Sequence, residues 1–150
     1  MVAVHTAVSR SAEVPAQSVN LMETKMYVIE QPRPEPAAIP GVAHATWVGS
    51  ADGLQQLSVW RQSLEPGGAT PPHSHECDEV VLCLSGWGEV HVDGQAHRFG
   101  ADMTVVLPKG KVHQLFNVGL MPLETLGIFA ATPVATHLPD GQALDLPWRT

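Results

Sequence analysis

The chain has 150 residues, a formal charge of −7, and eight Lys and Arg residues against fifteen Asp and Glu residues. Apolar residues make up 44% of it, enough for one hydrophobic core at the commonest domain size of about 100–150 residues. The scattered basic residues argue against a nucleic-acid partner, and no apolar run reaches the ~18 residues of a membrane span. We therefore predict a folded, cytoplasmic chain that binds neither nucleic acid nor membrane.

The first 42 residues show no strong hydrophobic periodicity. A short run at 26–30, MYVIE, has the composition of an edge strand, and the following QPRPEPAAIPG contains four prolines, which hold the chain extended with few ladder hydrogen bonds. We predict that residues 1–42 form an extended, proline-rich N-terminal arm and that residues 43–150 form the folded domain.

Short apolar or alternating runs recur from residue 46 onward, separated by turn sequences such as SADG, PGG, DG and PKG. No long stretch with helical periodicity competes with them. The clearest hairpin turns at Asp93-Gly94, because this pair supplies the positive φ angles of a type I′ turn. The pattern predicts an all-β domain of about eight strands, built as a sandwich or barrel.

The stretch GGATPPHSHECDEVVLCLSG, residues 67–86, carries the first candidate site residues. His73 and His75 share one face of an extended strand, because side chains alternate faces. Glu79 has the same parity but would lie about 13 Å from His75 on a continuous strand. The chain must therefore turn within residues 76–78, which brings Glu79 back to face the histidines.

A third imidazole arrives in PKGKVHQLFN, residues 108–117, where Pro108 and Gly110 form a turn ahead of His113. Barrel closure points alternate residues of all strands into one lumen. His73, His75, Glu79 and His113 could thus form a cluster of three nitrogen ligands and one oxygen ligand. The competing interpretation is a hairpin whose histidines are satisfied by ordinary hydrogen bonds.

The two motifs resemble those of the cupin superfamily. The first motif matches at every fixed position, and the second departs from the family only at its leading glycine, where this chain has Asp102. The matching residues are Gly67, His73, His75, Glu79 and Gly86 in the first motif, and Pro108, Gly110, His113 and Asn117 in the second. The resemblance implies a cupin-type double-stranded β-helix, or jelly-roll barrel, with the extended N-terminal arm in front. It also implies a homodimer, with the arm laid against the sheet edge of the partner.

Imidazole and carboxylate ligands suit one divalent transition metal per chain, namely Fe, Mn, Ni, Co, Cu or Zn, and the lack of a thiolate ligand argues against structural zinc. An octahedral ion with four protein ligands would keep two open positions. Together with an apolar lumen, this predicts a dioxygenase-like enzyme for a small, largely apolar or enolic substrate, with Glu79 as both ligand and catalytic base. Two alternatives stay open: an oxygen-independent isomerase, lyase or cyclase, and a non-catalytic binding or sensing module.

The remaining candidates are less specific. We expect both cysteines to be reduced, with Cys83 buried and Cys77 facing solvent in the turn. Arg61 and Gln62 are possible substrate contacts, although the sequence does not settle which of them faces the lumen. We expect the four tryptophans to serve packing, and the C-terminal segment LPDGQALDLPWRT to wrap the outside of the domain.

Overall fold

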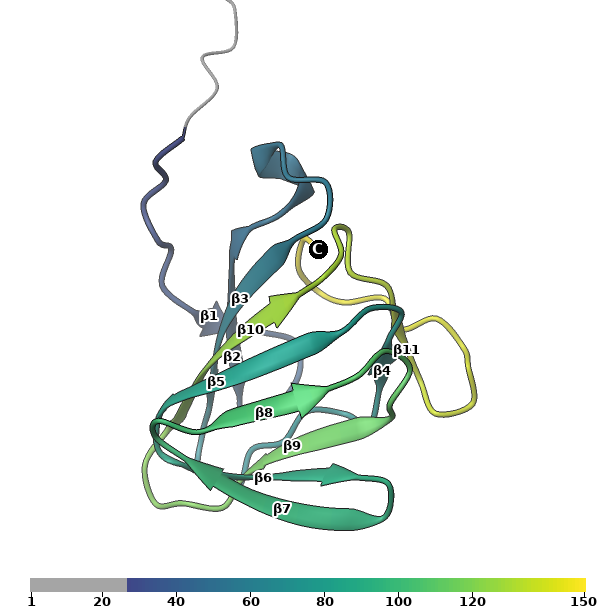
Figure 1. Ribbon diagram of the computed structural model, residues 1–150. Coiled ribbons are helices and arrows are strands. Elements are labelled where there is room, and N and C mark those ends of the chain that lie inside the picture. Colours follow the sequence, from purple (N-terminus) through teal and green to yellow (C-terminus); the bar gives the residue numbers. More distant parts are fainter. Residues whose placement is uncertain (1–26) are drawn as a thin grey trace, which may run out of the picture.

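The computed structural model describes residues 27–150, which form antiparallel strands and one short 3-10 helix, η1 (Ser50–Asp52) (Figure 1). The strands of this part of the chain are β1 (Glu35–Pro36), β2 (Val42–Val48), β3 (Ser58–Leu64), β4 (Ser74–His75), β5 (Glu79–Ser85), β6 (Trp87–Val92), β7 (Gln95–Gly100), β8 (Thr104–Leu107), β9 (His113–Asn117), β10 (Leu123–Phe129) and β11 (Thr136–His137). The predicted all-β class is confirmed.

Two sheets form the barrel. The larger has the strand order β1-β2-β3-β10-β5-β8, the smaller has the order β7-β6-β9, and β11 pairs with β4 at one end (Figure 1). Burial alternates residue by residue along the strands, and the inward side chains of both sheets meet in one core that includes Leu64, Val81, Leu115 and Leu123. This arrangement is the expected jelly-roll barrel.

Two turns take the left-handed backbone conformation. Asp93 and Gly94 have φ angles of 52° and 74° between β6 and β7, as the type I′ hairpin requires. Asp102 has φ 65°, which is the conformation that glycine adopts most easily. The departure from the second motif therefore concerns the backbone of one turn, and aspartate is among the residues that tolerate this conformation.

The strand predicted at 26–30 is wrong for the residues that the structure describes, since Tyr27–Glu30 form no ladder, and Met26 lies outside the described residues. The edge of β2 pairs instead with β1, where Glu35 lies opposite His44 and Pro36 opposite Ala43. Proline is tolerated there because an edge strand can turn its nitrogen away from the ladder. The boundary between arm and domain at residue 42 stays a prediction.

The C-terminal segment does more than wrap the outside of the domain. Trp148 stacks on His44 of β2, with ring centroids 3.9 Å apart and planes 12° from parallel. The Thr46 hydroxyl donates a hydrogen bond to the carbonyl of Arg149 at 2.7 Å. These contacts hold the segment against the barrel end that also carries β4 and β11.

No helix within residues 27–150 is long and apolar enough to cross a membrane.

Candidate metal centre

His73 and His75 are placed by a short extended segment that pairs on both sides. The backbone of His73 exchanges two hydrogen bonds with that of His113, at 3.0 and 2.8 Å, and His75 on β4 lies opposite Thr136 on β11. Because one residue separates the two histidines, the extended backbone turns both imidazoles to the same face. Their ring centroids are 4.9 Å apart.

Glu79 is the first residue of β5 and lies between Leu107 on β8 and Phe129 on β10. The predicted turn before it is present: the backbone carbonyl of Asp78 accepts a hydrogen bond from Ala130, and its carboxylate accepts one from the amide of Lys109 at 2.9 Å. This turn brings the Glu79 carboxylate within 3.5 Å of Nε2 of His75.

His113 begins β9 and brings the fourth side chain. Its Nε2 lies 3.2 Å from Oε2 of Glu79. The ligand atoms of His73, His75, Glu79 and His113 all lie within 4.8 Å of one another. Three of the four residues are buried, and His73 is partly buried. The structure thus brings together the four residues that the sequence spacing predicted.

The other ring nitrogen of each histidine faces a backbone carbonyl. Nδ1 lies 2.6 Å from Pro71 O in His73, 2.8 Å from Lys111 O in His113 and 3.3 Å from Ala135 O in His75. A carbonyl oxygen only accepts, so Nδ1 of His73 and Nδ1 of His113 carry the hydrogen. Nδ1 of His75 also lies 3.1 Å from the Thr136 hydroxyl, which can either accept from it or donate to it. In the neutral forms of His73 and His113, Nε2 then presents a lone pair to the cluster, as metal-binding histidines do.

The centre of the cluster has polar atoms without partners. Nε2 of His75, Nε2 of His113 and Oε2 of Glu79 are buried and make no hydrogen bond within the described part of the chain. Lone pairs of neutral imidazoles and a carboxylate repel one another at such distances. A cation among them would satisfy all three atoms, so the residues present fit a metal ion.

The electrostatics agree with this fit. Burial lowers the pKa of His73 to about 4, helped by the nearby His113 and His75. Burial also lowers the pKa of His75. Burial would raise the pKa of Glu79, but its contact with His113 and the neighbouring imidazoles outweigh that effect and hold the pKa below its usual value.

The pKa of His113 shifts in the opposite direction. Burial would lower its pKa, but the Glu79 carboxylate outweighs burial and raises it. Glu79 is therefore ionised and His73 is neutral at pH 7, which are the protonation states that metal ligation needs. Without a cation, a proton on His113 relieves the repulsion between Nε2 and the carboxylate.

A small pocket adjoins the cluster. Its volume is about 30 Å³, on the order of one or two water molecules. Side chains from the barrel and from the C-terminal segment close it. They are Trp60, Gln62, Thr70, Pro71, Leu115 and Phe129 from the barrel, and Leu144, Leu146 and Trp148 from the C-terminal segment.

Several pocket residues were not singled out by the sequence. Trp60 and Trp148 were expected only to pack, yet both line the pocket, and their indole N–H groups are buried without a hydrogen-bond partner among the described residues. Gln62 faces the pocket, whereas Arg61 points to the outer face and pairs with Glu124. Gln62 lies two residues before the buried Leu64 and therefore shares its face of β3, which is the one signal that would have identified Gln62 as a pocket residue.

The two cysteines gave one correct and one wrong prediction. Both are free thiols, and Cys83 is buried in the core as expected. Cys77 was expected to face solvent but is only 8% exposed. It packs with Trp60, Phe129 and Val134, because the turn at 76–78 folds inward beneath the segment after β10.

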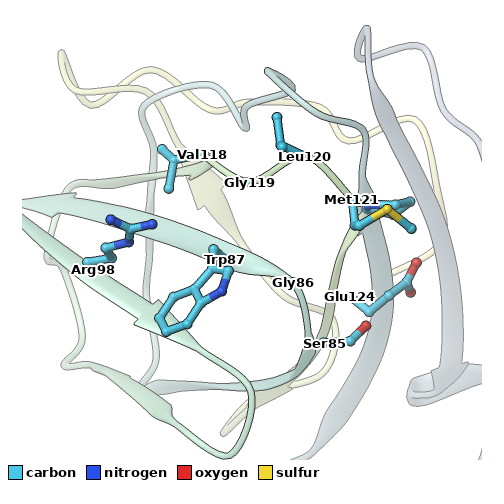
Figure 2. Close-up of a pocket in the computed structure, with 10 residues that line it drawn as sticks. Ser85, Gly86, Trp87, Arg98, Val118, Gly119, Leu120, Met121 and Glu124 are labelled. Carbon is cyan, nitrogen blue, oxygen red and sulfur yellow. The ribbon is translucent and has the colours of Figure 1, made fainter.

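A much wider groove lies elsewhere on the described part of the chain. It has a volume of about 810 Å³ and runs between the β5–β6 turn and the β9–β10 loop. Figure 2 shows Trp87 and Arg98 on one side of it and Leu120 and Met121 on another. None of the four cluster residues lines this groove. Size alone therefore does not mark the chemistry of this chain.

Known proteins resemble this chain in sequence and fold. The cupin domain family matches residues 60–129. Auxin-binding protein 1 of Arabidopsis thaliana is 32% identical over 63% of this chain and 53% of its own length. Auxin-binding protein T85 of Nicotiana tabacum is 28% identical over 93% of this chain and 81% of its own. The chain thus spans about half of the first relative and most of the second.

A solved structure supports the same relationship. The sugar phosphate isomerase from Silicibacter pomeroyi, described as a cupin superfamily member, superposes with a TM-score of 0.59 and 27% identity over 68% of each chain. The double-sheet barrel, with its His and Glu cluster at one end, defines a class of small β-barrel proteins with a possible metal site. This chain belongs to the cupin superfamily.

Proposed function

We propose that His73, His75, Glu79 and His113 bind one divalent transition metal ion per chain, drawn from Fe, Mn, Ni, Co, Cu and Zn. The carrying observation is the convergence of the four ligand atoms, which lie within 4.8 Å of one another in a largely buried cluster. A buried polar atom without a partner costs on the order of 1–3 kcal/mol, and a cation shared by the four side chains would give each ligand atom a partner. The Nδ1 hydrogen bonds of His73 and His113 to backbone carbonyls support the same role, because they fix the tautomer that leaves Nε2 free.

The pocket beside the cluster favours a small, largely apolar substrate with acceptor oxygens. Its ionisable lining residues are all members of the cluster, and the rest of its wall is mainly aromatic and aliphatic. The unpartnered indole N–H groups of Trp60 and Trp148 offer two donors to such oxygens. An enol, an enolate or a carboxylate meets these conditions, whereas a sugar phosphate would need cations that this wall lacks.

We infer a mononuclear, metal-dependent enzyme of the dioxygenase type. When bound, the metal supplies Lewis-acid activation of substrate oxygens and, if it is redox-active, chemistry with dioxygen. Glu79 is the catalytic residue of the chain: its lowered pKa keeps the carboxylate ionised, so an oxygen of Glu79 can accept the proton of an enol. Trp60, Leu115 and Phe129 exclude water around that proton.

Anaerobic reconstitution tests both parts of the proposal. Metal-free protein is loaded with Fe(II), Mn(II) or Ni(II), and oxygen uptake is followed with diketones, flavonols and catechols. We expect a single equivalent of metal, lost in Glu79→Gln and retained in His97→Ala, a control histidine that is exposed on β7. A Glu79→Gln variant that binds metal like the wild type would overturn the ligand assignment. No oxygen uptake with any metal would overturn the dioxygenase assignment alone.

A non-catalytic binding module is the second candidate, favoured by the names of the relatives. The Arabidopsis and tobacco proteins are named as auxin-binding proteins, and the aromatic wall of the pocket suits a flat aromatic acid. Titration calorimetry of the metal-loaded chain with indole-3-acetic acid, an auxin, tests this function. Binding followed by recovery of the unchanged acid would favour capture. An oxygen-independent isomerase, lyase or cyclase that uses Glu79 as its base predicts product under strict anaerobiosis.

Three predictions about the surroundings of the chain stay predictions. They are a homodimer, a cytoplasmic location, and partners limited to small molecules, without nucleic acid or membrane. Light scattering of the purified protein tests the first of them. If the arm reaches the sheet edge of a partner, removing residues 1–30 will convert the dimer to a monomer, and the measured mass will fall to that of one shortened chain.

A further inference from the structure

Inward side chains of β2 and β3 form a series of hydrogen bonds beside the candidate metal centre. Gln62 on β3 lies directly opposite His44 on β2, and its amide nitrogen lies 3.2 Å from Nδ1 of His44. Nε2 of His44 lies 2.9 Å from the Thr46 hydroxyl, which in turn lies 2.7 Å from the carbonyl oxygen of Arg149. We call these four groups the His44 network. It connects a residue that lines the pocket to the C-terminal segment.

The carbonyl of Arg149 fixes the direction of every bond in the His44 network. A carbonyl oxygen only accepts, so the Thr46 hydroxyl donates its one hydrogen to it. Thr46 can then only accept from the ring, so Nε2 of His44 carries a hydrogen. In the neutral imidazole, Nδ1 is then an acceptor and needs a donor from Gln62. The amide nitrogen of Gln62 therefore faces His44, and the carbonyl oxygen Oε1 is turned away from the ring.

The surroundings of His44 keep its ring neutral. The residue is only 8% exposed, because Trp148 stacks on the ring and Trp60 meets it edge-on. Burial lowers the pKa of His44 to about 3, and no carboxylate within residues 27–150 offsets this effect. Near neutral pH the ring therefore carries a single hydrogen, and the directions set by the Arg149 carbonyl hold.

The His44 network decides which atom of the Gln62 amide is left for the pocket. The amide nitrogen and oxygen differ little in size, so packing alone does not distinguish the two orientations of the group. Turning the amide over would place Oε1 against the lone pair of Nδ1 of His44. Oε1 makes no hydrogen bond with the described part of the chain, whereas the indole N–H groups of Trp60 and Trp148 are donors. The pocket thus offers one fixed acceptor beside two donors.

We propose that His44 is a positioning residue, which holds Gln62 as a hydrogen-bond acceptor and thereby gives the pocket a preference for ligands that carry a hydroxyl group. A hydroxyl group donates to Oε1, whereas a ligand with carboxylate oxygens alone leaves this acceptor without a partner. Enols, phenols and α-hydroxy acids combine such a donor with an oxygen for the metal. The preference rests on the proposed function, because it concerns a ligand held beside the metal-loaded cluster.

The His44 network is tested first without a ligand, on the full chain saturated with Zn(II), which is diamagnetic. Nitrogen-15 NMR of the imidazoles distinguishes the two neutral tautomers, and we expect His44 to carry its hydrogen on Nε2. We also expect an amide proton of Gln62 to exchange with water more slowly than those of Gln95, an exposed residue of β7. In His44→Leu this protection should be lost. A His44 ring with its hydrogen on Nδ1 would overturn the proposal.

A matched pair of ligands tests the preference itself. Mandelate and phenylacetate differ by one hydroxyl group, and titration calorimetry of the Zn(II)-saturated chain gives the ratio of their affinities. We expect the preference for mandelate to fall about five-fold in His44→Leu and in Gln62→Met, which is the effect of one lost hydrogen bond. His44→Asn is the rescue variant, because its amide oxygen can take the place of Nδ1, and it should keep the ratio of the wild type.

The ratio separates positioning from a structural role. If His44 acted only by stacking on Trp148, its loss would change both affinities alike and leave their ratio unchanged, which would overturn the proposal. Equal ratios in His44→Asn and His44→Leu would overturn it too, and so would a Zn(II)-saturated chain that binds neither anion. Zinc content is measured in every variant and should stay at one equivalent. A loss of zinc would instead count against the proposed metal site, while the tautomer of His44 would still report on the network.

Discussion

Trp148→Ala tests whether the C-terminal segment acts as a plug over the candidate metal centre. The indole stacks on His44 at 3.9 Å and meets Trp60 edge-on at 5.8 Å. It also lines the pocket of about 30 Å³ beside the cluster. A ligand larger than water needs part of this wall to move, and Trp148 is one of the side chains that form it.

The contacts set the expected magnitudes. Two aromatic pairs contribute about 0.5–1.5 kcal/mol each, and a partly buried tryptophan loses less on truncation than the 3–5 kcal/mol typical of a core position. We expect the free energy of unfolding to fall by about 2 kcal/mol. The vacated space, on the order of 100 Å³, approaches the cavities that bind benzene. If displacing the ring costs the ligand about 2 kcal/mol, the affinity for a small aromatic acid rises roughly 30-fold.

Titration calorimetry with indole-3-acetic acid, on protein loaded with the same metal, measures this affinity, and urea unfolding measures the stability. Trp87→Ala is the control, because Trp87 is 48% exposed and lines the distant groove rather than the pocket. Tighter binding combined with lower stability supports the plug. Weaker binding in Trp148→Ala would refute it and make the indole a direct contact of the ligand.

Three further changes follow from the structure. In Gly86→Ala the new Cβ would lie 2.6 Å from the carbonyl oxygen of Pro122, at a residue whose φ is +89°. We therefore expect urea unfolding to show a free energy of unfolding lower by about 2–4 kcal/mol. Gly94→Ala is the control, because its Cβ would meet nothing within 4 Å, and an equal loss in both variants would contradict the prediction. Asp102→Gly removes the strain of the left-handed backbone conformation at φ 65°, so we expect the protein to be more stable by about 0.5 kcal/mol, with its metal content unchanged. A less stable variant would show that the aspartate side chain contributes to stability. Burial lowers the pKa of His44 from 6.5 to about 3, so the unfolded chain binds more protons within that range and stability falls as the pH drops through it. His44→Gln should reduce the stability lost between pH 6.5 and 4 by on the order of 2 kcal/mol, and a loss equal to that of the wild type would argue against this role.

The cluster could be predicted because its geometry is local. Alternation along one strand puts His73 and His75 on one face, and the turn needed to return Glu79 involves only three residues. The hairpin at Asp93 follows in the same way from two turn residues. His113 needed one more assumption, that the strands close into a barrel whose lumen collects alternate residues.

The pocket wall could not be predicted because its contacts are long-range. The stacking of Trp148 on His44 joins residues more than a hundred positions apart, and LPDGQALDLPWRT has no periodicity to indicate where it docks. Cys77 was misplaced for a similar reason, since its burial depends on the segment that follows β10. Which of Arg61 and Gln62 faces the lumen depends on the pairing of β3 with β10, and the sequence of one strand does not reveal that pairing.

His73 and His113 make the same local hydrogen bond to the backbone. Each Nδ1 meets the carbonyl two residues earlier in the chain, at Pro71 and at Lys111. Folding alone therefore orients these imidazoles, before any ion arrives. Metal loading should then proceed with little change in heat capacity and at a rate set by dehydration of the ion, because it orders no further part of the chain.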